Sequence, residues 1–147
     1  MNFRILWPAF CVPLGVLFLS AEPLSPRVVE YNIVARLDPA AKTLEGQETI
    51  TYRHQGDEDL PSLQFHLYWN AFRDARSTFQ RELAVGSPDY QFDERRAGWI
   101  DISSVRLPDG AELVKGLRYL HPDDRNAEDR TVAEVALPEP APAGSTF

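Results

Sequence analysis

Several residue types are scarce in this sequence, and each scarcity excludes a class of protein. The single cysteine, Cys11, excludes an internal disulfide framework. Three histidines and one cysteine leave few ligands for a transition-metal site. The 15 Lys and Arg residues are outnumbered by 22 Asp and Glu residues, which gives a net charge of −7. Because basic side chains must replace the counterions of a nucleic acid, we predict no nucleic-acid partner.

What the sequence does contain is the composition of a globular protein. Its 147 residues are 44% hydrophobic, 25% charged and 11% aromatic. That mixture is not typical of a disordered or collagen-like chain. The length suits one domain, or part of a larger protein.

The longest apolar run lies at the amino terminus. Arg4 precedes it, and the run covers residues 5–19 with only two prolines and a glycine in it. Small residues then lead to Ala21, so the segment 1–21 is predicted to be a signal peptide cleaved after Ala21. The protein is therefore expected to be exported, either to a periplasm or out of the cell. An uncleaved membrane anchor is the alternative, although the run is short of the roughly 20 residues that a spanning helix needs.

Cleavage after Ala21 removes both Cys11 and Arg4, which leaves a cysteine-free chain with a net charge of −8. Large apolar residues surround Cys11, so we do not expect a lipoprotein cleavage there. Without disulfides, the stability of the mature chain must come from core burial or from a partner.

Strand patterns account for most of residues 22–147. Apolar side chains occupy every second position of Val29–Leu37, and Thr43–His54 is rich in Thr, Ile and Tyr. Turn residues 38–42 join the two segments, which predicts a hairpin, and Gly46 marks a bulge or a close backbone approach. Further strands are predicted at Ser62–Trp69, Trp99–Leu107, Ala111–Leu120 and Thr131–Leu137.

The remaining segments predict connections and one helix. Ser77 and Gln80 have the spacing of a capping box, which predicts a short helix, and residues 86–98 read as a long loop. Prolines 138, 140 and 142 are expected to break the chain before a new strand begins at 144–147. We therefore predict an all-β, antiparallel β-sandwich over residues 22–147, truncated at its carboxyl end.

The three histidines do not form a recognisable site. They are His54, His66 and His121. None has a second histidine three or four residues away, so paired ligation from a helix is excluded. His66 is either a ligand or, as we favour, an ordinary half-exposed strand residue.

The acidic residues also lack the spacing of a known site. We interpret the cluster Asp57, Glu58 and Asp59 as a solvated turn, because the alternation of a calcium loop is missing. The pair Asp123 and Asp124 is interpreted in the same way, with Arg125 and Arg130 expected to neutralise it. The candidates for a carboxylate pair of the glycosidase type are Glu82, Asp89, Asp93 and Glu94. The sequence places no two of these four within reach of each other.

No Gly-x-Ser-x-Gly, Ser-x-x-Lys, phosphate-loop or dinucleotide motif is present. The sequence therefore assigns no catalytic, cofactor-binding or metal-binding residue. Its most unusual feature is the aromatic run Phe65–Phe72. Exposed Tyr68 and Trp69 would stack on a sugar or peptide, whereas the interpretation we favour is a central strand buried on one face between two sheets.

The order of these features resembles a known family. Tyr31 and Leu37-Asp38 are followed by Leu44-Glu45-Gly46, then by Glu48-Thr49-Ile50-Thr51-Tyr52 and an acidic loop. The run Phe65-His66-Leu67-Tyr68-Trp69-Asn70-Ala71-Phe72 comes next. This sequence is similar to the start of the amino-terminal β-domain of M1 family zinc aminopeptidases, in an exported bacterial branch. The resemblance covers about residues 28–147 and is strongest over 31–79.

The resemblance implies a longer parent enzyme that removes amino-terminal residues from peptides. In that family a His-Glu-x-x-His helix and a later Glu hold zinc, and a Gly-x-Met-Glu-Asn motif grips the free amine of the substrate. All of these follow the β-domain, and none matches a position here, so zinc is expected only in the full-length parent. This chain would supply a saddle-like β-platform, with the catalytic domain of the same polypeptide and the peptide substrate as its partners.

Two function hypotheses remain. The first is the non-catalytic amino-terminal domain of an exported zinc aminopeptidase-like protein, which supports the catalytic domain and the rim of the substrate cleft. The second is a stand-alone secreted β-sandwich that binds a sugar, a peptide or a partner protein through its aromatic residues. A membrane contact is expected only through an uncleaved signal peptide.

Overall fold

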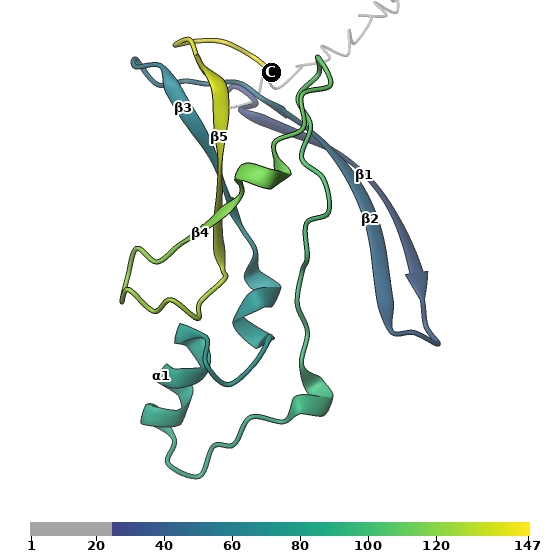
Figure 1. The fold of residues 1–147 in the computed structure, drawn as a ribbon, viewed down its shortest axis with the longest axis vertical. Helices are drawn as coiled ribbons and strands as arrows, with labels where there is room; N and C mark the ends of the chain where they lie inside the picture. Colours follow the sequence, from purple (N-terminus) through teal and green to yellow (C-terminus); the bar gives the residue numbers. More distant parts are fainter. Residues whose placement is uncertain (1–24) are drawn as a thin grey trace, which may run out of the picture.

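The computed structural model describes residues 25–147, which contain two antiparallel sheets and one α-helix (Figure 1). This confirms the prediction of an antiparallel, β-rich chain. The predicted signal peptide, with Cys11 and the cleavage position at Ala21, lies outside the described residues. Over residues 25–147, no helix has the length and apolar character needed to cross a membrane.

The first sheet is a long hairpin made of β1 (Val29–Asp38) and β2 (Thr43–Tyr52). Asp38 closes its turn, because the carboxylate Oδ1 accepts hydrogen bonds from the backbone N–H groups of Ala40 and Ala41, both at 2.9 Å. Lys42 completes the turn in the left-handed region, with φ of 55°. The predicted hairpin is confirmed.

The pairing of the hairpin is regular along its whole length. Val29 lies opposite Tyr52, Asp38 lies opposite Thr43, and the register between them is unbroken. Gly46 takes its place in this register opposite Ala35, so the predicted bulge is wrong. Since directly opposed residues share one face of an antiparallel pair, the alternation of apolar residues gives the hairpin one mainly apolar face, which includes Glu48, and one mainly polar face, which includes Val34.

The second sheet has the strand order β3-β5-β4 (Leu60–His66, Val132–Ala141 and Arg118–Leu120). β5 continues through Pro138 and Pro140, so these prolines do not end the strand as predicted. They do interrupt its pairing with β3, whose register shifts between Ala136, opposite Ser62, and Ala141, opposite Leu60. Only the first three residues of β5 pair with β4, so the prolines lie where no β4 residue needs their missing N–H. β3 is an edge strand, not the predicted central one.

A buried carboxylate ties the three strands of this sheet together. Glu134 of β5 is 7% exposed and accepts hydrogen bonds from Ser62 Oγ at 2.9 Å, from Gln64 Nε2 at 3.4 Å and from Arg118 Nε at 2.5 Å. The hydrogen bonds from Ser62 and Arg118 hold the pKa of Glu134 below its ordinary value. The carboxylate is therefore ionised and bonded at neutral pH, and it links β3 to β4 across β5.

The two sheets meet at the carboxyl-terminal end of the chain. Tyr52 and Phe147 exchange backbone hydrogen bonds at 2.8 and 3.1 Å, and His54 N–H donates to Ser145 O at 2.9 Å. The rings of Tyr52 and Phe147 pack edge to face, with centroids 5.7 Å apart. The strand predicted to begin at 144–147 therefore exists as a short bridge onto the end of β2.

His54 orders the acidic loop that follows β2. Its buried ring places Nε2 2.6 Å from Glu58 O, and Gly56 N–H donates to Nδ1 at 3.4 Å. A Cβ atom at Gly56 would lie 2.7 Å from His54 Cε1, so the loop can close around the ring only with glycine there.

We expect Gly56→Ala to lower the free energy of unfolding by about 1–3 kcal/mol, because the added methyl group displaces the His54 ring or the loop. Urea denaturation of residues 22–147 measures the change. Gly116→Ala is the matched control, since open space surrounds Gly116, and it should stay within about 0.5 kcal/mol of the unchanged chain. Equal losses in the two variants would contradict this assignment.

Two predicted strands end or begin elsewhere than expected, and a third is absent from the described residues. β3 ends at His66, and Tyr68–Phe72 forms the 3₁₀ helix η1 instead of continuing the strand to Trp69. Trp99–Leu107 is not a strand and has only an isolated bridge from Arg106 to Glu112. In 111–120, the strand is restricted to β4, after the 3₁₀ helix η3 (Val114–Gly116). The predicted loop 86–98 contains one 3₁₀ turn, η2 (Glu94–Arg96).

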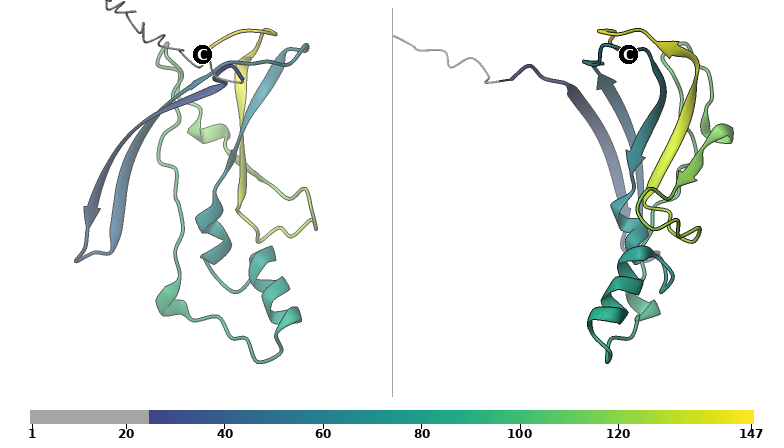
Figure 2. Two further views of the ribbon diagram at one scale, coloured as in Figure 1. Left: turned by 180° about the vertical axis from the view of Figure 1, so that it is seen from behind. Right: turned by 90° about the vertical axis from the view of Figure 1, so that its left-hand side faces the viewer.

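The described residues do not confirm a sandwich. The hairpin diverges from the three-stranded sheet instead of lying flat on it (Figure 2). The buried apolar side chains of residues 25–147 are few, and they lie near the second sheet: Leu67, Leu113, Ala133 and Val135. The hairpin contributes no side chain to this set.

Candidate functional site

The structure places the predicted histidines in three different settings. His54 is buried in the loop described above, whereas His66 is exposed at the end of β3 and stacks on Tyr68 with ring centroids 3.8 Å apart. His121 follows β4, and together with His66 it lines a small cavity of about 50 Å³. Asp123, Asp124 and Asp129 line the same cavity. Across residues 25–147, no group of three or more His, Cys, Asp or Glu side chains is arranged to hold a metal ion.

The loop formed by residues 121–130 hydrogen-bonds to the amino-terminal end of the α-helix, and we call this loop the helix clamp. Helix α1 (Thr78–Gly86) begins as predicted, with Ser77 Oγ accepting from Gln80 N–H at 3.3 Å. Asp129 is 6% exposed, and its Oδ2 accepts from Thr78 N–H at 2.9 Å. Asn126 Nδ2 donates to Arg76 O at 2.8 Å. A carboxylate at a helix amino terminus is favourable, so the loop stabilises the start of α1.

Asp123 and Asp124 are exposed in a turn, as predicted, but the expected neutralisation of Asp124 by arginines is wrong. Its Oδ2 accepts from Thr78 Oγ1 at 2.9 Å, and its Oδ1 accepts from Asn126 N–H at 2.9 Å. Arg130 lies over the ring of Tyr119, 5.5 Å from its centroid. In the described part of the chain, neither Arg125 nor Arg130 forms an ion pair.

The hydrogen bonds of Asp129 in the helix clamp predict how the free energy of unfolding depends on pH. Burial raises the pKa of Asp129, but the hydrogen bonds from Thr131 and Thr78 outweigh burial and bring it below the ordinary value of 3.8. A carboxylate with a lowered pKa in the folded state contributes stability that is present above the unfolded pKa and is lost as the pH falls through the folded pKa. Asp129→Asn should therefore flatten the loss of stability below about pH 4.

Urea denaturation at a series of acidic pH values measures that slope. Asp57→Asn is the control. Asp57 is exposed in the loop that follows β2, so its substitution should leave the slope unchanged. If Asp129→Asn and the unchanged chain lose stability in parallel as the pH falls, Asp129 does not carry this contribution.

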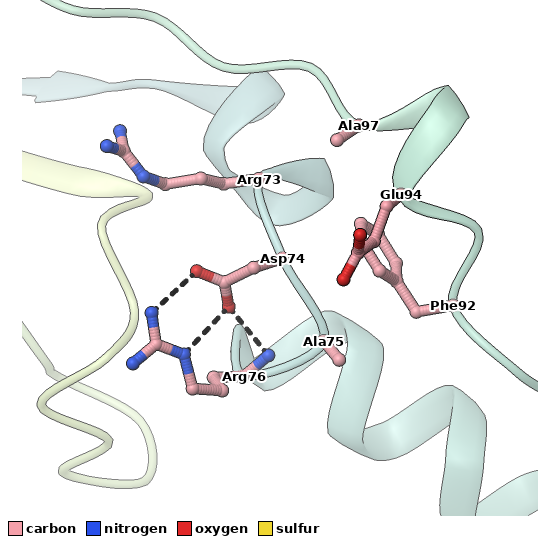
Figure 3. Close-up of a pocket in the computed structure, with 7 residues that line it drawn as sticks. All are labelled: Arg73, Asp74, Ala75, Arg76, Phe92, Glu94 and Ala97. Atoms are coloured by element: carbon pink, nitrogen blue, oxygen red, sulfur yellow. Dashed lines mark hydrogen bonds and ion pairs between the residues drawn. The ribbon is translucent and has the colours of Figure 1, made fainter.

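The four candidate carboxylates lie in different settings. Glu82 lies on α1 and Asp89 lies in the turn after it. Asp93 is held by Arg95, with Nε 2.8 Å from Oδ1, while Glu94 lines a shallow open depression of about 460 Å³. Figure 3 shows the depression between the two loop walls formed by 73–76 and 92–97.

The other charged groups at this depression are already neutralised. Arg76 hydrogen-bonds Asp74, with Nη2 3.0 Å from Oδ2 (Figure 3). Its Nη1 lies 2.8 Å from Glu128 Oε2. The bond from Arg76 holds the pKa of Asp74 below its ordinary value. The depression thus contains structural ion pairs and no assembled acid–base machinery.

Asn70 explains why the aromatic run leaves the sheet. Its side chain is 1% exposed, with Nδ2 donating to Arg130 O at 2.9 Å and Oδ1 accepting from Ile100 N–H at 2.8 Å. The last strand-like bond, from Leu67 N–H to Thr131 O, immediately precedes η1. Burying this amide turns the chain inward and places the neighbouring aromatic side chains on the surface.

The predicted burial of the aromatic residues is therefore wrong. Tyr68, Trp69 and Trp99 are 72%, 61% and 53% exposed. Trp69 packs edge to face on Phe72, with centroids 5.8 Å apart, and the Arg73 guanidinium lies 5.6 Å from the ring centroid of Trp99. We call Tyr68, Trp69, Phe72, Phe79 and Trp99 the aromatic surface.

The hairpin carries a second uncovered apolar surface. We call the shared face of Tyr31, Ile33, Leu37, Leu44 and Ile50 the apolar hairpin face; it also carries one charged residue, Glu48, opposite Ile33. Tyr31, Ile33, Leu37 and Leu44 are 58–67% exposed. Alternation in the sequence correctly predicted which side chains share this face, but not that it would be open. An isolated two-stranded hairpin is marginally stable, so its exposed apolar side chains are costly in water.

Comparisons with family models, with curated proteins and with solved structures found no match to this chain.

Proposed function

We propose that this chain is the non-catalytic amino-terminal β-platform of an exported zinc aminopeptidase-like protein. The observation that carries the proposal is the apolar hairpin face, which is regular, long and uncovered over the described residues. A surface of this kind gains stability when another polypeptide covers it, at roughly 25 cal/mol per Å² of apolar area removed from water. The resemblance of residues 31–79 to the M1 family gives the proposed partner, which is the catalytic domain of the same polypeptide.

The chemistry of the proposed parent belongs to that partner. Zinc would supply Lewis-acid stabilisation of the developing oxyanion there. The described residues offer no fitting ligand set, so we assign no residue of this chain to the metal. The role of this chain is to hold the catalytic domain and to contribute to the rim of the substrate cleft.

An activity assay tests the proposal. The full-length product of the reading frame, loaded with zinc, should release the chromophore from aminoacyl 4-nitroanilides, and residues 22–147 alone should not, with or without zinc. Zinc-dependent turnover by residues 22–147 would sink the assignment, as would a full-length product that is inactive and contains no zinc.

A second candidate function rests on the aromatic surface. Exposed Tyr68 and Trp69 would let a stand-alone module stack on a sugar or peptide. On this hypothesis Trp69→Ala should weaken the binding of the sugar or peptide by about tenfold or more, because large aromatic residues such as tryptophan commonly contribute most of the binding energy of an interface. Isothermal titration with chitotriose and with a Trp-containing pentapeptide measures it, and Val85→Ala, at an exposed position on α1, is the control. Absence of binding to both ligands by the unchanged chain would exclude this candidate for these two ligand classes.

A further inference from the structure

Residues 101–104 have the sequence pattern of a strand but no neighbouring strand. Ile100 and Ile102 are half-buried, whereas Asp101 and Ser103 are exposed, which is the alternation of a strand with one covered face. The alternation ends at Ser104, which is exposed although it shares the face of the two isoleucines. Figure 1 draws the segment as a long extended trace between the hairpin and β5. Within the described residues, no backbone hydrogen bond reaches any N–H or C=O group of residues 101–104.

Side chains hold this segment at both ends in place of a strand. At one end, Ile100 N–H donates to Asn70 Oδ1 at 2.8 Å. At the other end, Val105 N–H donates to Glu112 Oε1 at 2.8 Å, and Leu113 N–H donates to Val105 O at 2.7 Å. The contacts from Ser104, Arg106 and Val105 lower the pKa of Glu112 to about 2, so the accepting carboxylate is ionised at neutral pH.

These two attachments leave a row of unpaired backbone groups in an ordered, extended segment. Such a row is a template for strand addition, in which main-chain hydrogen bonds give affinity and alternate side chains give specificity. The same feature explains why the sequence predicted a strand at Trp99–Leu107. The residues have the pattern, but the strand that completes the ladder is absent from residues 25–147.

We propose that residues 101–104 pair with an extended strand of the polypeptide that covers the apolar hairpin face. The proposal rests on the proposed function, because it takes the same partner. A polypeptide is the occupant that fits, since consecutive peptide units supply the alternating donors and acceptors that this segment lacks. The net charge of −7 disfavours a second copy of this chain, because two copies repel each other.

The side chains define the chemistry of the added strand. On the covered side it carries apolar residues beside Ile100 and Ile102, and on the open side it carries polar residues opposite Asp101 and Ser103. The carboxylate of Asp101 already pairs with the Arg73 guanidinium at 3.2 Å and accepts from Trp99 Nε1 at 2.9 Å, so the residue opposite it is expected to be polar and uncharged.

Hydrogen exchange read by mass spectrometry tests the pairing. We expect the amides of residues 101–104 to exchange at least about tenfold more slowly in the full-length product than in residues 22–147. Equally fast exchange in both proteins would overturn the strand addition. If the hairpin is protected while 101–104 is not, the proposed function stands and this inference fails; if 101–104 is protected while the hairpin is not, the proposed docking face fails. Protection that appears only as the protein concentration rises would assign the strand to a second copy and overturn the proposed occupant.

Proline substitutions identify the paired edge. Ser103→Pro and Ser104→Pro each remove one backbone N–H group. The N–H groups of consecutive strand residues point toward opposite edges of the strand. One of the two should abolish the protection of 101–104 in the full-length product, while Ser103→Ala and Ser104→Ala retain it. Unchanged protection in both proline variants would contradict the pairing. The exchange comparison on the unchanged proteins decides the question if either variant does not fold.

Discussion

Aspartate in place of Ile33 should lower the free energy of unfolding of the full-length product by about 3 kcal/mol or more. The residue lies on the apolar hairpin face with 63% of its surface exposed. If the proposed partner covers that face, the new carboxylate is buried without a counterion and directly opposite Glu48, which costs several kcal/mol. Chemical denaturation of the full-length product measures the loss.

Val34→Asp provides the matched control for this expectation. Val34 is the next residue of β1, points to the opposite face of the hairpin and is 69% exposed. It should change the stability by less than about 0.5 kcal/mol, as surface substitutions usually do. Equal effects of the two substitutions would mean that the apolar hairpin face is not covered in the full-length product.

Asn70→Ala should destabilise residues 22–147 by about 2–5 kcal/mol. The substitution removes the partners of two backbone groups, Arg130 C=O and Ile100 N–H, at a site that is 1% exposed. Each buried backbone group left without a hydrogen bond costs about 1–3 kcal/mol. We also expect the loop that contains Ile100 to exchange its amides faster, since Asn70 is its attachment to η1.

Asn32→Ala controls for the loss of an asparagine as such. Asn32 is exposed on the polar face of β1, so its removal should leave the urea midpoint nearly unchanged. A loss below about 1 kcal/mol in Asn70→Ala would contradict the central role of this side chain in the aromatic run.

Alternation predicted the parts of the fold that depend on local pattern. The hairpin, its turn at Asp38 and the helix start at Ser77 follow from side chains close in sequence. Trp99–Leu107 has an equally clear pattern, but a strand also requires a neighbour, and no residue within the segment reveals whether one exists. Pairing is a long-range property, and single-segment patterns do not contain it.

The aromatic surface and the helix clamp were less predictable, because both depend on contacts between residues far apart in the sequence. The exposure of Tyr68 and Trp69 depends on Asn70, whose amide joins Arg130 to Ile100 across long sequence separations. Asp129 was missed as a helix clamp because its partner, Thr78, is distant in sequence. The aspartates and asparagine of residues 123–129 were a signal, since such residues commonly hydrogen-bond backbone groups, but we interpreted the segment as a solvated loop.

The in-frame DNA sequence that follows the codon for Phe147 tests the central claim most directly. A β-platform of a zinc aminopeptidase-like protein predicts that the frame continues and encodes a His-Glu-x-x-His motif with a later glutamate. A stop codon immediately after Phe147 in undamaged DNA would contradict the claim. The aromatic surface would then become the first place to search for a ligand.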